Sequence, residues 1–361
     1  MFKTELFSIK IFQLNKFFIS TLVLSGVSVG LFAASVVYET KPLQVKRYDE
    51  IVSRANLFHP RVKAVAMAKW PNTIVFQNID TWKQMGVIKA HSTPERIIYS
   101  MTFSPTGKYI AAGMYDTKTK KSMVTVWEVE QNKLVANYNI LCTPDTIDFS
   151  SDGKFIAVAG SYERVKGAAQ LIDIDKGSIK TIWSTKSYEE WTATQIKFLP
   201  KSKVLAIAMV NKKRGILFYN TETSKTDFFP TKTDTYAIDF TQDAKFMVSG
   251  GGNEKSGNEI LVWNLDTKKV ITELKGHSSF VNSVKFTPNG KQVVSSAFEK
   301  GTRFRFWDIE SAKEIQSVKT DGNRSKSMSI SANGQYLVFE VESFGNAGNP
   351  ITMEFFIQAQ Q

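Results

Sequence analysis

A short marker recurs seven times along this 361-residue sequence and constrains its fold more than any other feature. In each copy an apolar residue is followed, five positions later, by Lys or, in the last copy, by Gln. The copies begin at Phe58, Phe103, Phe149, Phe198, Phe240, Phe286 and Ile330, so successive copies start 45, 46, 49, 42, 46 and 44 residues apart. A period of this size is typical of repeat architectures built from one supersecondary unit. We therefore expect a single repeat domain, although the length alone would accommodate two domains.

The clearest copy of the repeat, residues 276–308, indicates what each unit is. Two alternating apolar runs, VNSVKF and KQVVSSA, flank Pro288, Asn289 and Gly290, and a third run occupies residues 303–309. Asn-Gly between alternating runs predicts a β-hairpin, because both residues tolerate the positive φ of a primed turn. Each unit is therefore expected to be an antiparallel β-sheet.

The same copy opens with Gly276-His277 and closes with Trp307-Asp308, and in this it resembles the WD-repeat β-propeller family. The resemblance covers roughly residues 51–358 and implies an all-β fold, a seven-bladed β-propeller. The uncharged residues 17–38 place one N-terminal hydrophobic helix before it. The third strands of the blades are expected at residues 73–79, 123–129, 169–174, 215–220, 259–265, 303–309 and 352–358.

Residues 17–38 contain no charged side chain over 22 positions. As a helix this segment would extend roughly 33 Å, enough to cross a bilayer core of about 30 Å. Lys3, Lys10 and Lys16 precede it, which predicts a cytoplasmic N-terminus and a propeller on the other side of the membrane. The segment is expected to be an uncleaved membrane anchor. The alternative is a signal peptide cleaved at the small residues 33–35, which would leave a secreted or periplasmic propeller.

These features divide the chain into three parts. Residues 1–38 are expected to form the N-terminal signal-anchor or signal peptide, residues 39–50 a short linker, and residues 51–361 the propeller, with the bacterial periplasm as its compartment. The last repeat has three strands of its own, and in the family the N-terminus commonly supplies the fourth. Residues 42–47 have the alternation of a strand and are the expected closing strand, because closure removes two unpaired sheet edges at once.

In the family, a buried hydrogen-bond chain links a loop His, a second-strand Ser or Thr, a turn Asp and the Trp of one blade. The resemblance implies such a chain for His277, Ser295 and Trp307, with Glu299 where Asp is expected. A buried polar chain of this kind fixes the geometry of a blade if every member is satisfied. Its role is therefore predicted to be structural.

The remaining histidines and the single cysteine suggest no chemistry. His91 and Trp127 are expected to form a partial version of the same chain, and His59 is expected to lie on the surface at a turn. Cys142 alone cannot form an internal disulfide, and one Cys with three His disfavours a metal site. We therefore predict no catalytic residue, no metal and no cofactor.

Loops on a rigid scaffold are where binding function concentrates. In a propeller, the loops between second and third strands share one face with the loops between blades. On that face the second to fourth repeats present eight basic residues: Lys118, Lys120, Lys121, Arg164, Lys166, Lys212, Lys213 and Arg214. Asp116 and Glu163 oppose them, and the seventh repeat brings Glu340 and Glu342 instead. The whole chain has a formal net charge of +12. This basic sector is therefore expected to receive an acidic partner.

The leading hypothesis is a non-catalytic protein–protein interaction platform, exported or anchored in a membrane through residues 17–38, that binds a protein partner with its loops. Nucleic acid is disfavoured as a partner if the chain is exported. The alternative is a propeller enzyme or small-ligand binder acting at the mouth of the central channel. An enzyme needs titratable side chains that converge in one pocket, and three scattered histidines give that alternative little support. The sequence identifies no small-molecule substrate.

Overall fold

A computed structural model describes most of the chain beyond its N-terminal region. The described residues are 44–48, 55–69, 72–90, 95–162, 166–185, 192–212, 214–253, 257–299, 303–320, 324–344 and 350–358. Residues 17–38, the predicted hydrophobic helix, lie outside these ranges, so that prediction stays untested. Within the described ranges, no helix is long and apolar enough to cross a bilayer.

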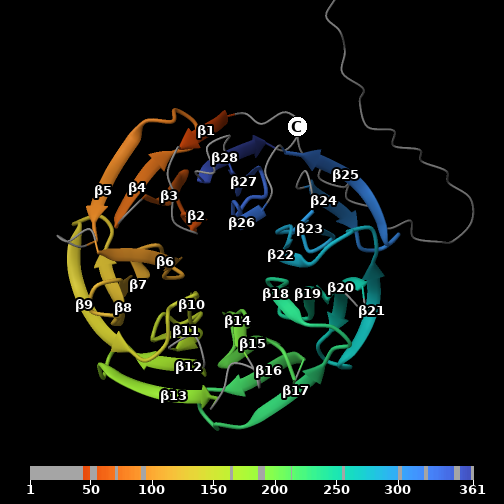
Figure 1. Ribbon diagram of the computed structural model, residues 1–361, viewed down its shortest axis with the longest axis horizontal. Coiled ribbons are helices and arrows are strands. Elements are labelled where there is room, and N and C mark those ends of the chain that lie inside the picture. The colour runs from red at the N-terminus through yellow and green to blue at the C-terminus, as the bar shows by residue number, and fades with distance from the viewer. Residues whose placement is uncertain are drawn as a thin grey trace, which may run out of the picture. The chain divides into compact units, whose positions relative to one another are not determined.

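Six four-stranded antiparallel sheets of consecutive strands stand around a central axis as blades (Figure 1). Blades 1 and 2 consist of β2 (Asn56–Phe58), β3 (Ala64–Lys69), β4 (Thr73–Asn78), β5 (Gln84–Lys89), and of β6 (Arg96–Phe103), β7 (Tyr109–Asp116), β8 (Ser122–Glu128), β9 (Lys133–Ile140). Blades 3 and 4 consist of β10 (Thr146–Phe149), β11 (Phe155–Tyr162), β12 (Lys166–Asp173), β13 (Ser178–Ser184), and of β14 (Thr192–Phe198), β15 (Val204–Val210), β16 (Gly215–Asn220), β17 (Thr226–Pro230). Blades 5 and 6 consist of β18 (Thr235–Phe240), β19 (Phe246–Asn253), β20 (Gly257–Asn264), β21 (Lys269–Leu274), and of β22 (Val281–Phe286), β23 (Gln292–Ala297), β24 (Arg303–Asp308), β25 (Lys313–Lys319). The predicted all-β propeller is therefore confirmed.

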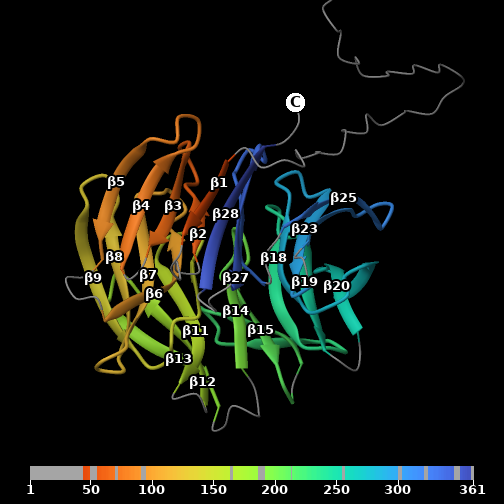
Figure 2. The same ribbon diagram turned by 45° about the horizontal axis from the view of Figure 1, so that its top comes forward.

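A further sheet lies between blades 6 and 1 and combines both ends of the described chain (Figures 1 and 2). This closing sheet consists of β26 (Arg324–Ile330), β27 (Tyr336–Phe344), β28 (Pro350–Gln358) and, at its outer edge, β1 (Gln44–Tyr48). The pairing of β1 with β28 is antiparallel, with Val45 opposite Phe355. At the inner edge, the backbone N–H of Phe58 in blade 1 donates to Ser329 Oγ of the closing sheet at 3.3 Å. Strands far apart in the sequence thus join at this point.

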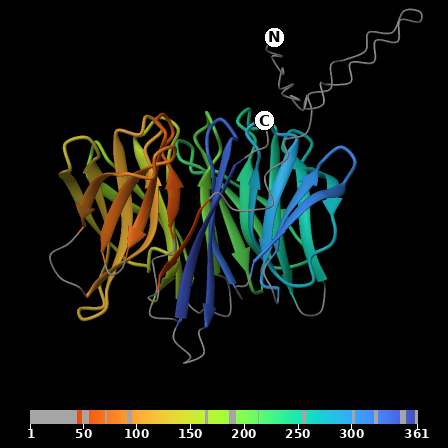
Figure 3. The ribbon, with the colours of Figure 1, turned by 90° about the horizontal axis from the view of Figure 1, so that it is seen from above.

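Apolar side chains fill the spaces between neighbouring blades. Between blades 5 and 6, for example, Val248 and Val262 pack with Val284, Val293 and Trp307, and all five are at least nine-tenths buried. Each fully buried side chain of this kind stabilises the fold by roughly 1.5–3 kcal/mol relative to its exposed state. The core of the propeller is therefore a series of apolar clusters between neighbouring blades, whose strands stand upright side by side in Figure 3.

Close packing of the blades requires a small side chain at one position of the second strand. A Cβ atom on Gly250 would lie 2.7 Å from Val284 Cγ1 in the next blade. The corresponding residues in other blades are Gly113, Ala159, Ala208 and Ser296. The closing sheet has Glu340 there, and its side chain is fully buried. The prediction that Glu340 belongs to the exposed loops is therefore wrong, because β27 continues to Phe344 and keeps Glu340 inside the sheet.

The turn between the first and second strands differs from the predicted primed turn. In blade 6 only Gly290 has a positive φ, 70°, and Asn289 does not. Asn289 Oδ1 instead accepts hydrogen bonds from the Thr287 hydroxyl at 2.7 Å and from the Lys291 N–H at 3.0 Å. The same contacts recur in three other sheets, with Asp152, Asp243 and Asn333 as acceptors. A side chain that satisfies the donors of the turn makes a second positive φ unnecessary.

Candidate functional site

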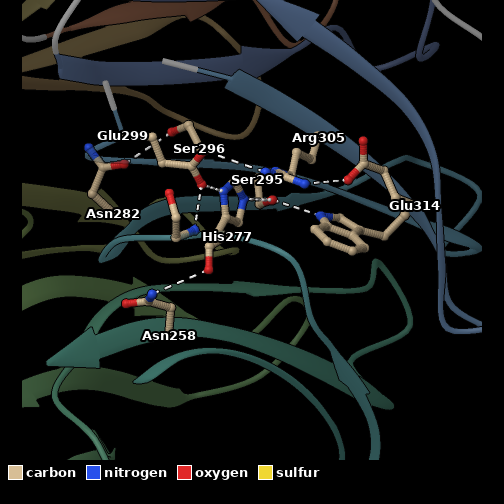
Figure 4. A network of polar contacts seen from close by, with 10 residues as sticks. Asn258, His277, Asn282, Ser295, Ser296, Glu299, Arg305 and Glu314 are labelled. Atoms are coloured by element: carbon tan, nitrogen blue, oxygen red, sulfur yellow. Dashed lines mark hydrogen bonds and ion pairs between the residues drawn. The ribbon is translucent and has the colours of Figure 1, made fainter. Parts of the chain in front are cut away.

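Blade 6 contains a buried hydrogen-bond network around His277 (Figure 4). The Trp307 indole N–H donates to Ser295 Oγ at 2.7 Å, and Ser295 Oγ lies 2.7 Å from His277 Nε2. His277 Nδ1 lies 2.5 Å from Glu299 Oε1. Because a carboxylate can only accept, His277 must donate through Nδ1, so its Nε2 accepts the Ser295 proton. The four side chains therefore form one directional chain from the indole to the carboxylate.

Glu299 is held as a carboxylate by its surroundings. Burial acts to raise its pKa, but the hydrogen bond from His277 Nδ1, the Ser278 N–H at 3.0 Å and the nearby Arg305 together lower the pKa to about 2. Arg305 Nη2 lies 3.4 Å from Glu299 Oε2, and Arg305 Nη1 reaches Glu314 at 2.5 Å. The network thus extends from the interior of the blade to its outer strand.

The order Ser295, His277 and Glu299 has the connectivity of a nucleophile–base–acid triad. A nucleophile must reach its substrate, however, and the Ser295 side chain is fully buried with its oxygen already accepting the Trp307 N–H. Ser295 is therefore not placed to attack a substrate. Among the described residues, no group of three or more His, Cys, Asp or Glu side chains could hold a metal ion.

Blade 5 carries a shorter version of this network, and blade 2 lacks its central hydroxyl. In blade 5 the Trp263 indole N–H donates to Ser249 Oγ at 2.9 Å. In blade 2, Ala112 occupies the place of that serine in the strand register, so Trp127 has no hydroxyl there to receive its N–H. The partial network predicted for blade 2 therefore lacks its serine, and His91 lies outside the described residues.

His59 lies at the turn between β2 and β3 and is half-buried. Its Nδ1 accepts the backbone N–H groups of Arg61 and Val62, both at 3.1 Å, and its Nε2 therefore donates to the Gly107 carbonyl at 3.1 Å. The ring also meets Phe103 edge to face, with the ring centroids 4.9 Å apart. His59 thus ties the first turn of blade 1 to the corresponding turn of blade 2.

The connection between β7 and β8 presents the exposed lysines Lys118, Lys120 and Lys121. Its backbone is closed by two hydrogen bonds of 2.8 Å, from the Asp116 N–H to the Lys121 carbonyl and from the Lys120 N–H to the Asp116 carbonyl. Lys120 occupies the left-handed region with a φ of 59°. The three charges therefore project from an ordered hairpin tip.

Asp116 supports this hairpin from beneath and is 6% exposed. Its Oδ1 accepts the N–H groups of Lys118 at 3.0 Å and Thr119 at 2.8 Å, and its Oδ2 pairs with Arg96 Nε at 3.2 Å. The hydrogen bond from the Thr119 N–H is the main cause that lowers the pKa of Asp116 to about 2, with smaller contributions from Arg96 and the Lys118 N–H. The prediction that Asp116 opposes the lysines at the surface is therefore wrong, because its carboxylate is engaged inside the loop.

The other basic residues are placed less uniformly. Lys212 is exposed, whereas Arg214 Nε pairs with Asp234 Oδ1 at 3.0 Å, the oxygen that also accepts the Asn211 N–H at 3.0 Å. Blade 3 separates this loop from the β7–β8 hairpin (Figure 1). The predicted residues outside the description are Glu163, Arg164 and Lys213, and the side chains of Lys166 and Glu342. The described part of the basic sector therefore consists of two clusters on blades 2 and 4.

The innermost strands of the six blades and of the closing sheet line a central channel (Figure 1). The residue directly before each marker faces one of two cavities in this channel: Leu57, Thr102, Asp148, Lys197, Asp239, Lys285 and Ser329. Four consecutive members alternate in charge, and we name Asp148, Lys197, Asp239 and Lys285 the charged arc. The sequence analysis missed it, although the position before each marker could have revealed it.

The geometry agrees with comparisons to known proteins. The family model described as "WD domain, G-beta repeat" matches residues 82–120 and 268–308. The structure titled "Crystal structure of RRP9 WD40 repeats" superimposes with a TM-score of 0.67 over 90% of this chain and 100% of that chain, at 15% sequence identity. The chain is a β-propeller that carries WD40 repeats at residues 82–120 and 268–308.

Sequence relatives of this WD40 propeller are distant. Periodic tryptophan protein 2 homolog from Caenorhabditis elegans is 21% identical over 311 residues, which cover 81% of this chain and 31% of that protein. Pre-mRNA-processing factor 19 from Bos taurus is 28% identical over 102 residues, covering 28% of this chain and 19% of that protein. The WD40 propeller therefore spans less than a third of the length of these relatives, and their similarity indicates the repeat rather than a shared task.

Proposed function

We propose that this WD40 propeller is a non-catalytic platform, a closed ring of seven blades, that binds an acidic segment of a protein partner through its loops. Its membership of the WD40 family supports the general role, because propellers of this family typically serve as protein-binding scaffolds. The buried position of the one triad-like set of side chains supports the absence of chemistry. The platform would act by presenting charge on a rigid frame.

The observation that carries the proposal is the hairpin tip between β7 and β8. Lys118, Lys120 and Lys121 are exposed there, and the nearest carboxylate, Asp116, is occupied by the loop backbone and by Arg96. The positive charge at the tip is therefore not cancelled locally. An ordered loop also loses little conformational entropy when it binds, which favours association. Lys212 and Arg214 on blade 4 would extend the contact to a longer acidic segment.

Reversing the three hairpin charges should weaken binding of an acidic peptide. We expect the triple variant Lys118→Glu, Lys120→Glu, Lys121→Glu to bind a labelled ten-residue polyglutamate peptide roughly tenfold more weakly at low salt, because each exposed ion pair contributes about 0.2–1 kcal/mol. Fluorescence anisotropy with the full-length chain measures the affinity. The matched control reverses Lys154, Lys245 and Lys291, three exposed lysines of the opposite face. Equal loss in both triple variants would mean that only net charge matters and would refute the hairpin as the site.

We also propose that residues 17–38 anchor the propeller in a membrane, with the propeller outside the cytoplasm. The support is the uncharged stretch of 22 residues and the lysines that precede it. Fractionation of cells that express the full-length chain, with mass determination of its N-terminus, tests the proposal. An alkali-resistant membrane pellet with an intact Met1 end is the expected result. A soluble form that begins near Val36 would show cleavage instead, and a soluble intact chain would contradict export altogether.

A further inference from the structure

Charged side chains lie between two cavities of the central channel. One cavity of about 320 Å³ is lined by the first halves of the innermost strands, including Thr146, Thr194 and Asn282, and another of about 260 Å³ is lined by their last residues and the following turns. Lys197 and Lys285 line both cavities, so these two side chains stand where the cavities meet. About a quarter of each lysine side chain is accessible from the channel.

Both carboxylates of the charged arc are already engaged. Asp148 Oδ2 accepts the Phe198 N–H of the next blade at 2.8 Å, and its Oδ1 lies 3.4 Å from the Thr102 hydroxyl. Asp239 repeats this geometry one blade pair further on, where its Oδ2 accepts the Phe286 N–H at 2.8 Å. The two aspartates therefore serve first as links between neighbouring innermost strands.

Lys285 shares its ion-pair partner, Asp239, with Lys197. Asp239 Oδ1 forms a direct hydrogen bond with Lys197 Nζ, and Lys285 Nζ lies 3.8 Å from that same oxygen. This is the one ion pair of Lys285 among the described residues. Two ammonium groups thus share one carboxylate oxygen at the wall of a cavity. An ammonium group can donate three hydrogen bonds, so Lys285 can donate to a further acceptor.

The charge state of these groups agrees with that picture. Burial, together with the neighbouring positive charge of Lys197, lowers the pKa of Lys285 to about 8, although the charges of Asp239 and, less strongly, Asp148 act to raise it. At neutral pH Lys285 is therefore still mostly protonated but destabilised by its surroundings. A second negative charge beside it would relieve both the lack of solvation and the repulsion from Lys197.

We propose that the channel of this propeller binds a small oxyanion, a carboxylate or a phosphate, between Lys285 and Lys197. The volume of the larger cavity lies at the lower end of the roughly 300–1,000 Å³ seen for ligand sites, which suits a small molecule. The Thr146 hydroxyl lines the same cavity and accepts the Ile196 N–H at 3.1 Å, so its own proton can be donated to an anion. This site is independent of the loop face proposed for the protein partner.

Two substitutions should change anion binding in opposite directions. Lys285→Met removes the ammonium charge at similar side-chain length, and we expect it to weaken binding of inorganic phosphate on the order of tenfold. Asp239→Asn keeps an oxygen for the Phe286 N–H but removes the charge that competes for both lysines, so it should tighten binding. Isothermal titration calorimetry of the full-length chain at pH 7, in a buffer free of oxyanions, measures both affinities. A parallel titration with succinate distinguishes a phosphate site from a carboxylate site.

Lys291→Met is the matched control, because Lys291 is an exposed lysine of the same blade. It should bind phosphate and succinate as the unmodified chain does. Circular dichroism of each variant establishes that the β-sheet content is retained. The proposal is overturned if neither anion binds at millimolar concentration, or if Lys285→Met and Lys291→Met bind equally well. Raising the pH to 9.5 should also weaken binding, because Lys285 then loses its proton.

Discussion

Replacing Trp307 with alanine is expected to lower the free energy of unfolding by about 3–5 kcal/mol, the usual cost of removing a buried aromatic side chain. The indole is 1% exposed and packs in the cluster between blades 5 and 6. Its N–H donates to Ser295 Oγ, and its ring meets His277 with the centroids 5.9 Å apart. The substitution therefore removes apolar packing and one donor of the buried network together. Urea denaturation of the full-length chain, followed by circular dichroism, measures the change.

Two further variants separate these contributions. Trp307→Phe keeps most of the apolar area and removes the N–H, so it should cost only about 1–3 kcal/mol. Ser295→Ala removes the centre of the chain and leaves His277 Nε2 without its donor, so its cost should be similar to that of Trp307→Phe. The double variant should cost less than the sum of the two, because both act on one hydrogen bond. Strict additivity would contradict a coupled network.

Gly160→Ala is expected to destabilise the propeller by about 3 kcal/mol or more, at the upper end of the range for overpacking. A Cβ atom on Gly160 would lie 1.9 Å from the Thr143 carbonyl oxygen and 2.7 Å from Asp145 Oδ2. The first of these atoms belongs to the backbone, so it cannot move aside without displacing the loop between blades 2 and 3. That loop is held to β11 by the Thr143 N–H, which donates to the Ser161 carbonyl at 2.6 Å. Thermal and urea denaturation measure the loss.

Gly86→Ala is the matched control for this prediction. Gly86 also lies within a strand, but its added Cβ would meet only Phe76 Cδ2, at an ordinary 4.0 Å. Alanine there should be neutral or slightly stabilising, because it reduces the conformational entropy of the unfolded chain. If the two variants had the same free energy of unfolding, the loop that contains Thr143 would have to move aside for the added Cβ, which would contradict this prediction.

Local sequence patterns predicted much of the fold. The marker that begins at Phe286 and its six counterparts recur with the blade period because each blade repeats the same hairpin, and a hairpin is specified by neighbouring residues. The predicted third strand at residues 303–309 is β24, Arg303–Asp308. The contacts of His277, Ser295 and Trp307 followed from a resemblance, not from spacing. The turn at Asn289-Gly290 was misjudged because a side-chain acceptor replaced a backbone conformation.

The candidate site was less accessible to sequence reasoning, since its electrostatics depend on which charges meet in space. Asp116 was expected to oppose the hairpin lysines, yet it is buried against Arg96 and the loop backbone. Arg214 was grouped with free basic residues, yet it pairs with Asp234, 20 residues further along. A charge run shows that a face is basic on average. It does not show which member remains available to a partner.

By itself, then, the sequence determined the repeat, the antiparallel strands within each blade and the uncharged segment at residues 17–38, because all three depend on residues that are close along the chain. Only the tertiary structure decided the register in which β1 pairs with β28, and that Lys197, Asp239 and Lys285 meet at the wall of one channel. The members of the charged arc are separated by 42 to 49 residues and come together only when the blades pack side by side around the axis. The physical reason is that such contacts depend on the closure of the ring, to which every blade contributes.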